Sequence, residues 1–220
     1  MTGNALKIIA AIAMVIDHGA LLFFPRIPLL RIIGRLAFPI FAFMIAEGCH
    51  YTRNRRRYFL QLFALAIVCQ IVYFIASGER LLSILFTFSL SILIIYALQY
   101  CKAKPGALRI ALFLAVVAGV YGLNRVLTID YGFWGCMVPV FAAAFRDTKC
   151  YSRPLSVTML GIGLIFLALA LGGVQIYALA ALPLLYCYSG RRGNAKMKYF
   201  FYIFYPAHLA LLQLLAWFLV

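Results

Sequence analysis

Long runs of apolar residues alternate along the chain with short breaks that contain proline, glycine or clustered positive charge. We interpret these runs as helices inside a membrane, because a helix satisfies its own backbone hydrogen bonds, as hydrocarbon requires. The runs predict helices over 5–24, 29–51, 57–76, 81–100, 107–123, 132–145, 155–171, 174–188 and 198–219. We therefore expect an all-α, polytopic transmembrane helical bundle of about nine spans, forming a single domain over residues 1–220.

The composition favours lipid as the solvent of this bundle. Hydrophobic residues make up 66% of the chain and charged residues only 11%, and the mean hydropathy is +1.02. A soluble domain of 220 residues has too little interior to hide that much apolar surface. The N-terminus does not resemble a cleaved signal peptide, since only Lys7 precedes the first apolar run and no small-x-small cleavage site follows it.

The net charge of +15 lies mainly in the short breaks between helices, which is typical of topology signals and excludes a nucleic-acid surface. An N-terminus in the cytoplasm gives the strongest positive-inside bias. The cytoplasmic side then carries Lys7, Arg53, Arg55, Arg56, Arg57, Lys102, Lys104, Arg109, Arg146, Lys149, Arg153, Arg191, Arg192, Lys196 and Lys198. The other side carries Arg26, Arg31, Arg35, Arg80 and Arg125. The short segment 132–145 has to cross for this bias to hold, so we count it as a span.

Ionisable residues inside the apolar runs are the strongest indication of function. Asp17 and His18 are adjacent in the run AMVIDHGALLFF, Arg35 lies in IIGRLAFPIF, and His208 lies in the last run. A charge near the bilayer centre costs at least about 2.5–3.5 kcal/mol, and such residues usually mark pathways or active sites. At about 1.5 Å per residue, these four side chains lie at similar depths in the membrane.

His18 is our candidate general base, because imidazole titrates near neutral pH and can take a proton from an attacking amine or hydroxyl. Asp17 points about 100° away from it on a helix, so we expect Asp17 to orient a group on another helix, such as His208 or Arg35. The alternative is that Asp17 and His18 only form hydrogen bonds between helices, typically worth about 0.6 kcal/mol.

The roles of His208 and Arg35 are also open in the sequence. His208 ends the motif YPAH, in which Pro206 can open the helix backbone and Tyr205 shares the face of His208. The same motif is compatible with a purely structural kink. Arg35 is deep enough to bind Asp17 or to stabilise charge developing on an oxygen, although its side chain can also extend outward to the interface.

Two basic segments and one aromatic segment complete the candidate site. TRNRRRY (52–58) and SGRRGNAKMKY (189–199) are suited to gripping a phosphorylated ligand from the cytosol, or serve only to set topology. DYGFWG (130–135) is either a turn close to a ligand or part of an interfacial aromatic belt. The binding candidates from these segments and their neighbours are Glu47, Arg53, Arg55, Arg56, Arg57, Tyr58, Asp130, Arg191, Arg192, Lys198, Tyr199 and Tyr205.

Several other site types are not expected. The three histidines lack the spacing of metal ligands, so we expect no metal site. Neither a Walker-type phosphate loop nor a GxSxG nucleophile elbow occurs in the chain.

An ordered set of motifs over nearly the whole chain resembles the TraX family. The motifs are LKIIA, IDH, IGRLAFPIFAF followed by Glu47-Gly48, TRNRRRY, DYGFWG and a closing YSG, RRG and KYFFYIFYPAHL, with 81–125 the least similar part. The resemblance implies an integral protein of the bacterial inner membrane that transfers an acetyl group from acetyl-CoA to the N-terminal amine of a pilin subunit. It also suggests kinship with larger membrane acyltransferases that use cytosolic acyl-CoA.

From these observations we expect an acetyl-CoA-dependent membrane acyltransferase, with membrane lipids and a pilin or another small membrane-associated acceptor as its partners. A small transporter or lipid-flipping protein with a buried relay of Asp17, His18 and Arg35 is the main alternative. The chain lacks an internal repeat and a matched pair of broken helices, which many carriers have. A non-catalytic assembly partner for pilus subunits is a third possibility.

Overall fold

The computed structural model describes residues 1–78, 80–146, 148–191, 193 and 198–219, with the side chains of 76, 77, 198, 199, 202 and 219 left out. These ranges are helical apart from connecting turns and one isolated bridge between Leu82 and Ile129. The elements are α1 (Gly3–Phe23), α2 (Pro28–Gly34), α3 (Ala37–Tyr51), α4 (Arg55–Ser77), α5 (Ile84–Ala103), α6 (Ala107–Val126), α7 (Gly132–Ala143), α8 (Arg153–Leu171), the 3-10 helix η1 (Gly173–Ala181), α9 (Leu182–Tyr186) and α10 (Lys198–Leu219). The expected all-α architecture is confirmed for the described residues.

Six segments of this structure are long and apolar enough to cross a membrane, which indicates a multi-pass membrane protein. They are Gly3–Phe23, Pro28–Tyr51, Arg55–Ile75, Ile84–Ala103, Ala107–Val126 and Arg153–Leu171. Three of the predicted spans correspond to shorter apolar helical segments, Gly132–Ala143, Gly173–Tyr186 and Ile203–Phe218. The total of nine crossings therefore stays a prediction.

Two predicted helices are broken in the structure. The expected helix over 29–51 is divided at Arg35 and Leu36 into α2 and α3, because Pro39 has no N–H to donate to the Arg35 carbonyl. The expected helix over 174–188 is a nine-residue 3-10 helix that continues into the short α9. The first break matters most for function, because it places Arg35 at a helix end instead of within a continuous helix.

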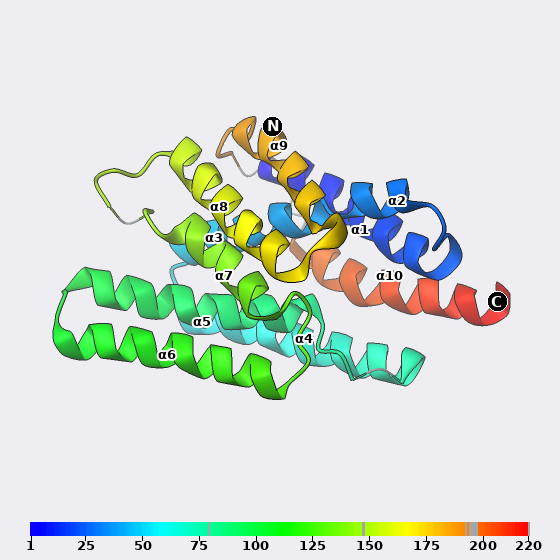
Figure 1. Cartoon of the computed structure of the whole chain (residues 1–220), viewed down its shortest axis with the longest axis horizontal. Coiled ribbons are helices and arrows are strands. Elements are labelled where there is room, and N and C mark those ends of the chain that lie inside the picture. The colour runs from blue at the N-terminus through cyan, green and yellow to red at the C-terminus, as the bar shows by residue number, and fades with distance from the viewer. Residues whose placement is uncertain (79, 147, 192, 194–197, 220) are drawn as a thin grey trace.

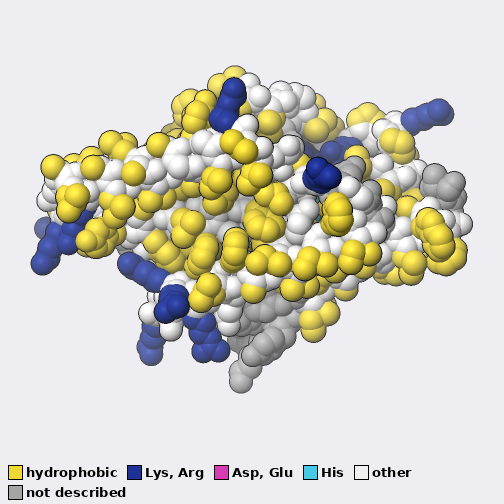
Figure 2. Space-filling model, turned by 90° about the horizontal axis from the view of Figure 1, so that it is seen from below, with side chains coloured by type: hydrophobic (Ala, Val, Ile, Leu, Met, Phe, Trp, Pro, Cys, Tyr) yellow, Lys and Arg dark blue, Asp and Glu magenta, His cyan; other side chains and the backbone are white. Residues whose placement is uncertain are grey.

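Helix α3 forms the centre of the bundle, and α6 lies at its edge (Figure 1). Most residues of α3 are buried, and its neighbours include α1, α5 and α7. In α6, Val120 is the one described residue that is fully buried. Figure 2 shows hydrophobic side chains over most of the face on the α4 and α6 side, while Lys and Arg gather mainly toward one end. This distribution suits a surface in contact with lipid tails between two polar ends.

Hydroxyl side chains connect α5 to α7 and hold the turn between α6 and α7 in place. The Ser91 hydroxyl donates to the Cys136 carbonyl at 2.8 Å, and the Thr87 hydroxyl donates to the Asp130 carbonyl at 2.5 Å. In Figure 1 this turn lies well short of the end formed by the loop between α1 and α2. Irregular backbone at such a depth is tolerated in a membrane protein where it is buried in protein or lines a cavity.

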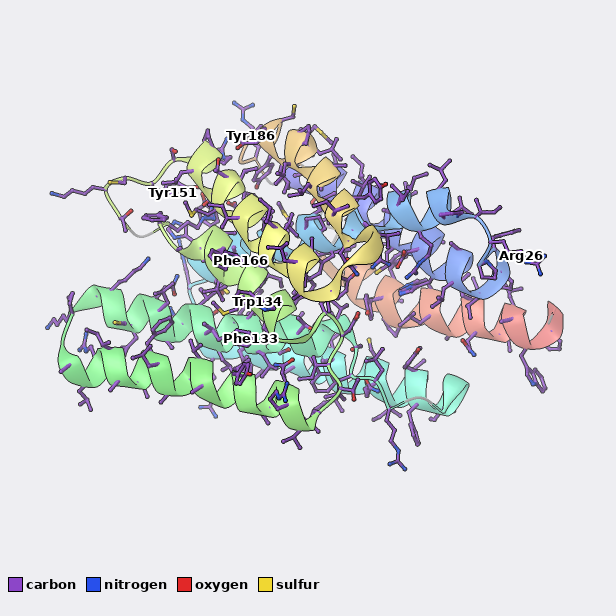
Figure 3. The ribbon with its side chains drawn as sticks, in the orientation of Figure 1. Arg26, Phe133, Trp134, Tyr151, Phe166 and Tyr186 are labelled. Carbon is purple, nitrogen blue, oxygen red and sulfur yellow. The ribbon has the colours of Figure 1, made fainter. Side chains whose placement is uncertain are left out.

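The two ends of the bundle carry different loops. Arg26, in the loop between α1 and α2, lies at one end, and Tyr151 lies at the other (Figure 3). We call the end with Tyr151 the basic end, because the neighbouring loop between α3 and α4 contains Arg53 and leads into Arg55. The loops between α1 and α2 and between α3 and α4 lie at opposite ends because the long helices run up and down the bundle in turn.

Candidate functional site

Asp17 and two arginines form an ion-pair cluster between α1 and the end of α2. One guanidinium nitrogen of Arg35 donates to both carboxylate oxygens of Asp17, at 2.6 and 2.5 Å, and Arg31 lies 3.0 Å from the same carboxylate. The side chains of Arg35 and Asp17 are 6% and 13% exposed. Of the partners that the sequence allowed for Asp17, the structure selects Arg35. It adds Arg31, which the sequence analysis had used only as a positive charge in assigning the orientation.

Gly34 lets α2 approach α1 closely enough for these contacts. A Cβ at Gly34 would overlap the carboxylate of Asp17, whereas a Cβ at Gly19 on α1 would meet nothing within 4 Å. We expect Gly34→Ala to cost about 1–3 kcal/mol, because Asp17 is held by two arginines and cannot move aside cheaply. Thermal unfolding in detergent micelles measures this cost, with Gly19→Ala as the matched control. Equal melting temperatures for the two variants would show that the close contact is absent.

His18 and His208 are in direct contact across α1 and α10. His18 Nδ1 lies 3.1 Å from His208 Nε2, and the rings stack with centroids 5.2 Å apart. His208 Nδ1 lies 3.0 Å from the carbonyl oxygen of Phe204. The sequence predicted similar depths for these side chains, and the structure brings them together.

The hydrogen bonds of this pair determine which nitrogen of each neutral ring carries the proton. A carbonyl only accepts, so His208 Nδ1 donates to Phe204 and His208 Nε2 is left as an acceptor. His18 Nδ1 must then donate to His208, which leaves His18 Nε2 unprotonated. This nitrogen has no hydrogen-bond partner among the residues that the structure describes. The arrangement prepares His18 Nε2 to accept a proton.

Tyr131 joins the ion-pair cluster to the turn before α7. Arg35 donates to the Tyr131 hydroxyl at 3.3 Å, and the Tyr131 ring stacks on Phe38 with centroids 4.2 Å apart. Tyr131 adopts a left-handed backbone conformation with φ of 61°, and a Cβ at Gly135 would overlap its side chain. Asp130 and Tyr131 of DYGFWG therefore lie beside Arg35.

The other aromatics of DYGFWG have a packing role. Phe133 and Trp134 point toward neighbouring helices in Figure 3. Phe133 contacts Tyr121 of α6 at 5.3 Å between ring centroids, and Trp134 stacks on Phe166 of α8 at 5.1 Å. The segment is thus divided between a part at the candidate site and a part that anchors α7 to its neighbours.

A cavity of about 1410 Å³ connects this polar centre to the basic end of the bundle. His18, Asp17 and Arg35 line its middle, and Lys7, Asn54 and Arg57 line it near the basic end. Asp130, Tyr131 and Tyr205 also line it. His208 is not among the described lining residues, so it supports His18 from behind.

Three buried polar atoms on the cavity wall have no hydrogen-bond partner among the described residues. They are Arg35 Nε, Ser83 Oγ and Gln175 Oε1. A buried polar group without a partner costs about 1–3 kcal/mol, so these three atoms are available to a ligand or water once their side chains turn toward the cavity. Sequence reasoning missed Ser83, Gln175 and the cavity position of Lys7, because a single polar residue at the end of an apolar run has no distinctive pattern.

The predicted phosphate-binding residues differ in how they lie relative to the cavity. Arg57 and Tyr58 line it, whereas Arg53, Arg55 and Arg56 are exposed and not among its described lining residues. The guanidinium of Arg55 lies over the Tyr96 ring at 5.4 Å. The side chain of Arg56 lines a separate small groove on α4.

The second basic segment is only partly described. Arg191 is exposed, and its carbonyl accepts a hydrogen bond from the Gly3 N–H at 2.8 Å. Arg192 lies outside the described residues, and so do the side chains of Lys198 and Tyr199. The binding roles of this segment stay predictions.

Glu47 lines the cavity and forms an ion pair with Arg146. Arg146 also donates to the Tyr151 hydroxyl at 2.8 Å, and the Tyr188 hydroxyl donates to Glu47 at 3.5 Å. Sequence reasoning missed this pair, because Arg146 follows α7, which packs on α3 but is distant from it in sequence.

Within the described ranges, no group of three or more His, Cys, Asp or Glu side chains is arranged to hold a metal ion. The arrangement instead combines a preformed proton acceptor, a buried guanidinium and a cavity open to a basic surface. Such a combination is suited to a reaction that removes a proton and stabilises charge on an oxygen.

Comparison with known proteins gives a family match and two relatives. A family model described as TraX protein matches residues 2–216. The chain is 28% identical over 239 residues to the probable fimbrial assembly protein FimC, serogroup H1, of Dichelobacter nodosus, covering 94% of this chain and 92% of that protein. It is 50% identical over 40 residues to the uncharacterized protein RP591 of Rickettsia prowazekii (strain Madrid E), covering 18% of this chain and 16% of that protein. No solved structure matches the chain.

Proposed function

The chain belongs to the TraX family, and on this basis we propose that it is a membrane acyltransferase that moves an acetyl group from acetyl-CoA to an acceptor amine. The observation that carries the proposal is the unprotonated His18 Nε2 on a cavity that continues to the basic end. We place the N-terminus in the cytoplasm and the protein in the bacterial inner membrane, with about nine spans in a single domain, because this orientation gives the loops their positive-inside bias.

The donor enters the cavity from the basic end. Lys7 and Arg57 line this part of the cavity and are suited to the phosphates of CoA. Lys7 and His18 both belong to α1, and eleven residues separate them by about 16 Å along the helix axis. An extended pantetheine arm reaches over such a distance, so the thioester arrives beside His18 while the phosphates stay in the basic region.

In the proposed reaction the acceptor nitrogen attacks the thioester carbon while His18 Nε2 takes a proton from it. The carbon–sulfur bond breaks, and the proton passes from His18 to the CoA thiolate. Arg35 Nε, which lacks a partner among the described residues, and the Tyr205 hydroxyl are the donors available to the developing oxyanion. Asp17 acts indirectly, because it holds the guanidinium of Arg35 in position.

The acceptor we propose is the N-terminal amine of a pilin subunit or a similar membrane-associated protein. Family membership implies pilin acetylation, and the name of the Dichelobacter nodosus relative places that protein in fimbrial assembly. The test uses purified protein, acetyl-CoA and a candidate acceptor, with the acceptor mass as readout. Acetylation that depends on the protein is expected, and an unchanged acceptor mass in the presence of bound acetyl-CoA would contradict the pilin assignment.

We expect Lys7→Ala and Arg57→Ala each to weaken the binding of acetyl-CoA, because each removes a positive charge from the proposed phosphate site. Thermal stabilisation measures this binding, since a ligand at 100 times its Kd stabilises by about 2.7 kcal/mol. S-acetylpantetheine, which lacks the phosphates of CoA, should bind both variants and the unmodified protein alike. Arg26→Ala, in the loop at the opposite end, is the matched control. Equal stabilisation of all variants by acetyl-CoA would place the phosphates elsewhere.

A carrier is the second candidate, because the cavity extends over much of the bundle and includes an ion-pair cluster. The same thermal experiment separates the two functions. An acetyltransferase is stabilised by CoA thioesters, whereas a carrier for an unrelated solute leaves the melting temperature unchanged when acetyl-CoA is added.

A further inference from the structure

Asp130 is a cavity-lining carboxylate without an ion pair among the described residues. The nearby Arg35 donates from one terminal guanidinium nitrogen to both oxygens of Asp17 and from the other to the hydroxyl of Tyr131, so both terminal nitrogens are bound to residues other than Asp130. Arg35 and Arg31 attract this carboxylate without forming a direct ion pair with it. A partly buried carboxylate that lacks a directly bound cation is stabilised by a cationic ligand.

The backbone around Asp130 is held by the loop between α4 and α5 and by the first turn of α5. The Asp130 N–H donates to the Leu82 carbonyl at 2.9 Å, and the Thr87 hydroxyl donates to the Asp130 carbonyl at 2.5 Å. The Gln70 amide accepts from the Ser83 N–H at 3.0 Å and donates to the Leu81 carbonyl at 3.0 Å. These hydrogen bonds position a loop that has no regular secondary structure of its own, as a binding segment requires.

Two residues with hydroxyl groups, Ser83 and Tyr205, also line the cavity and lie near Asp130 in the structure. The Ser83 hydroxyl is buried and has no partner among the described residues. The preceding residue, Leu82, accepts the hydrogen bond from the Asp130 N–H. Tyr205 lines the cavity and interacts electrostatically with Asp130. An ammonium group has three N–H donors and no acceptor, so one carboxylate and two hydroxyl oxygens match its hydrogen-bonding needs.

We propose that Asp130, with Ser83 and Tyr205, forms the subsite that binds the acceptor as an ammonium ion and takes its first proton. This inference rests on the proposed function, because it specifies the charge state in which the acceptor arrives. The conversion of an ammonium ion and acetyl-CoA into an amide and CoA thiol releases one proton overall. Two protons leave the nitrogen, so two proton acceptors are needed, and the cavity wall provides Asp130 and His18.

A proton moves from the ammonium nitrogen to the Asp130 carboxylate, giving a neutral amine and a carboxylic acid. The amine nitrogen bonds to the thioester carbon, the carbon–sulfur bond breaks, and the second proton passes through His18 Nε2 to the CoA sulfur. Asp130 then loses its proton to water. A carboxylate partly withdrawn from water is a stronger base than a solvated one, which suits the first transfer.

Ligand binding without turnover tests the subsite independently of catalysis. The probes are benzylammonium chloride, benzyl alcohol and sodium phenylacetate, which share a ring and differ in charge. We expect benzylammonium to stabilise the protein most. Asp130→Asn should weaken its binding about tenfold to a hundredfold, as expected for the loss of a charged hydrogen bond, and Asp130→Glu should recover part of the loss. Thr128→Ala, on the same loop but with an exposed side chain, is the matched control.

A kinetic measurement then distinguishes this inference from the proposed function. With a short peptide that has a free α-amine as acceptor, Asp130→Asn should raise the KM for the peptide while stabilisation by acetyl-CoA stays normal. An unchanged KM in an active enzyme, or stabilisation by phenylacetate instead of benzylammonium, overturns the ammonium subsite alone. Binding of benzylammonium that depends on Asp130 in a protein with no acetyl transfer would support the subsite and contradict the proposed function.

Discussion

Replacing His18 by alanine is expected to lower kcat for acetyl transfer by about a hundredfold to ten-thousandfold while the protein keeps its fold. The reason is that His18 Nε2 is the cavity nitrogen that the hydrogen-bond chain from Phe204 through His208 leaves unprotonated. Initial rates with saturating acetyl-CoA measure the effect. The thermal shift with acetyl-CoA should stay near that of the unmodified protein, because the phosphate site is distant from the imidazole.

Two histidine variants serve as comparisons for this experiment. His50→Ala, on the exposed end of α3, should leave kcat unchanged. His208→Ala should reduce kcat by a smaller factor than His18→Ala, because His208 only sets the tautomer and orientation of His18. A His18→Ala protein that folds and keeps full activity would show that another group is the base.

Replacing Asp17 by alanine is expected to destabilise the protein by about 3–5 kcal/mol, the usual cost of leaving a buried charge without its partner. Arg35 is 5% exposed and would lose the carboxylate that accepts from it at 2.6 and 2.5 Å. Unfolding of the purified protein in mixed micelles measures the loss. The large effect reflects the low dielectric around the pair more than the attraction between its members.

The double variant Asp17→Ala with Arg35→Leu tests whether Asp17 and Arg35 stabilise the protein as an ion pair or independently of each other. Removal of both charges should recover most of the stability, because no uncompensated guanidinium is left in the membrane interior. Costs that simply add in the double variant would mean that Asp17 and Arg35 do not stabilise each other. Both Asp17→Ala and the double variant should lose activity, because each leaves Arg35 misplaced or absent.

Much of the fold follows from the sequence, since apolar runs and their breaks predict helices closely. The predicted run 107–123 corresponds to α6 (Ala107–Val126), and 81–100 corresponds to α5 (Ile84–Ala103). The break at Arg35 was missed, because a hydropathy pattern reports length and not the local effect of Pro39. The same break lets Arg35 turn toward Asp17, so the feature that the sequence analysis missed is also the one that forms this part of the candidate site.

Depth along each helix indicated which side chains were able to meet. The rise per residue placed Asp17, His18, Arg35 and His208 at similar depths, and the structure brings them together in two connected groups. Depth alone does not show which helices are neighbours. The pairing of Glu47 with Arg146 was therefore missed, since it depends on the contact between α3 and the turn after α7.

A density map of the protein with CoA bound tests the central claim most directly. The account predicts the phosphates between Lys7 and Arg57 and the sulfur within hydrogen-bonding distance of His18 Nε2, at the end of a pantetheine arm that follows the cavity. CoA density on the lipid-facing surface, or a sulfur atom far from both His18 and His208, would contradict it.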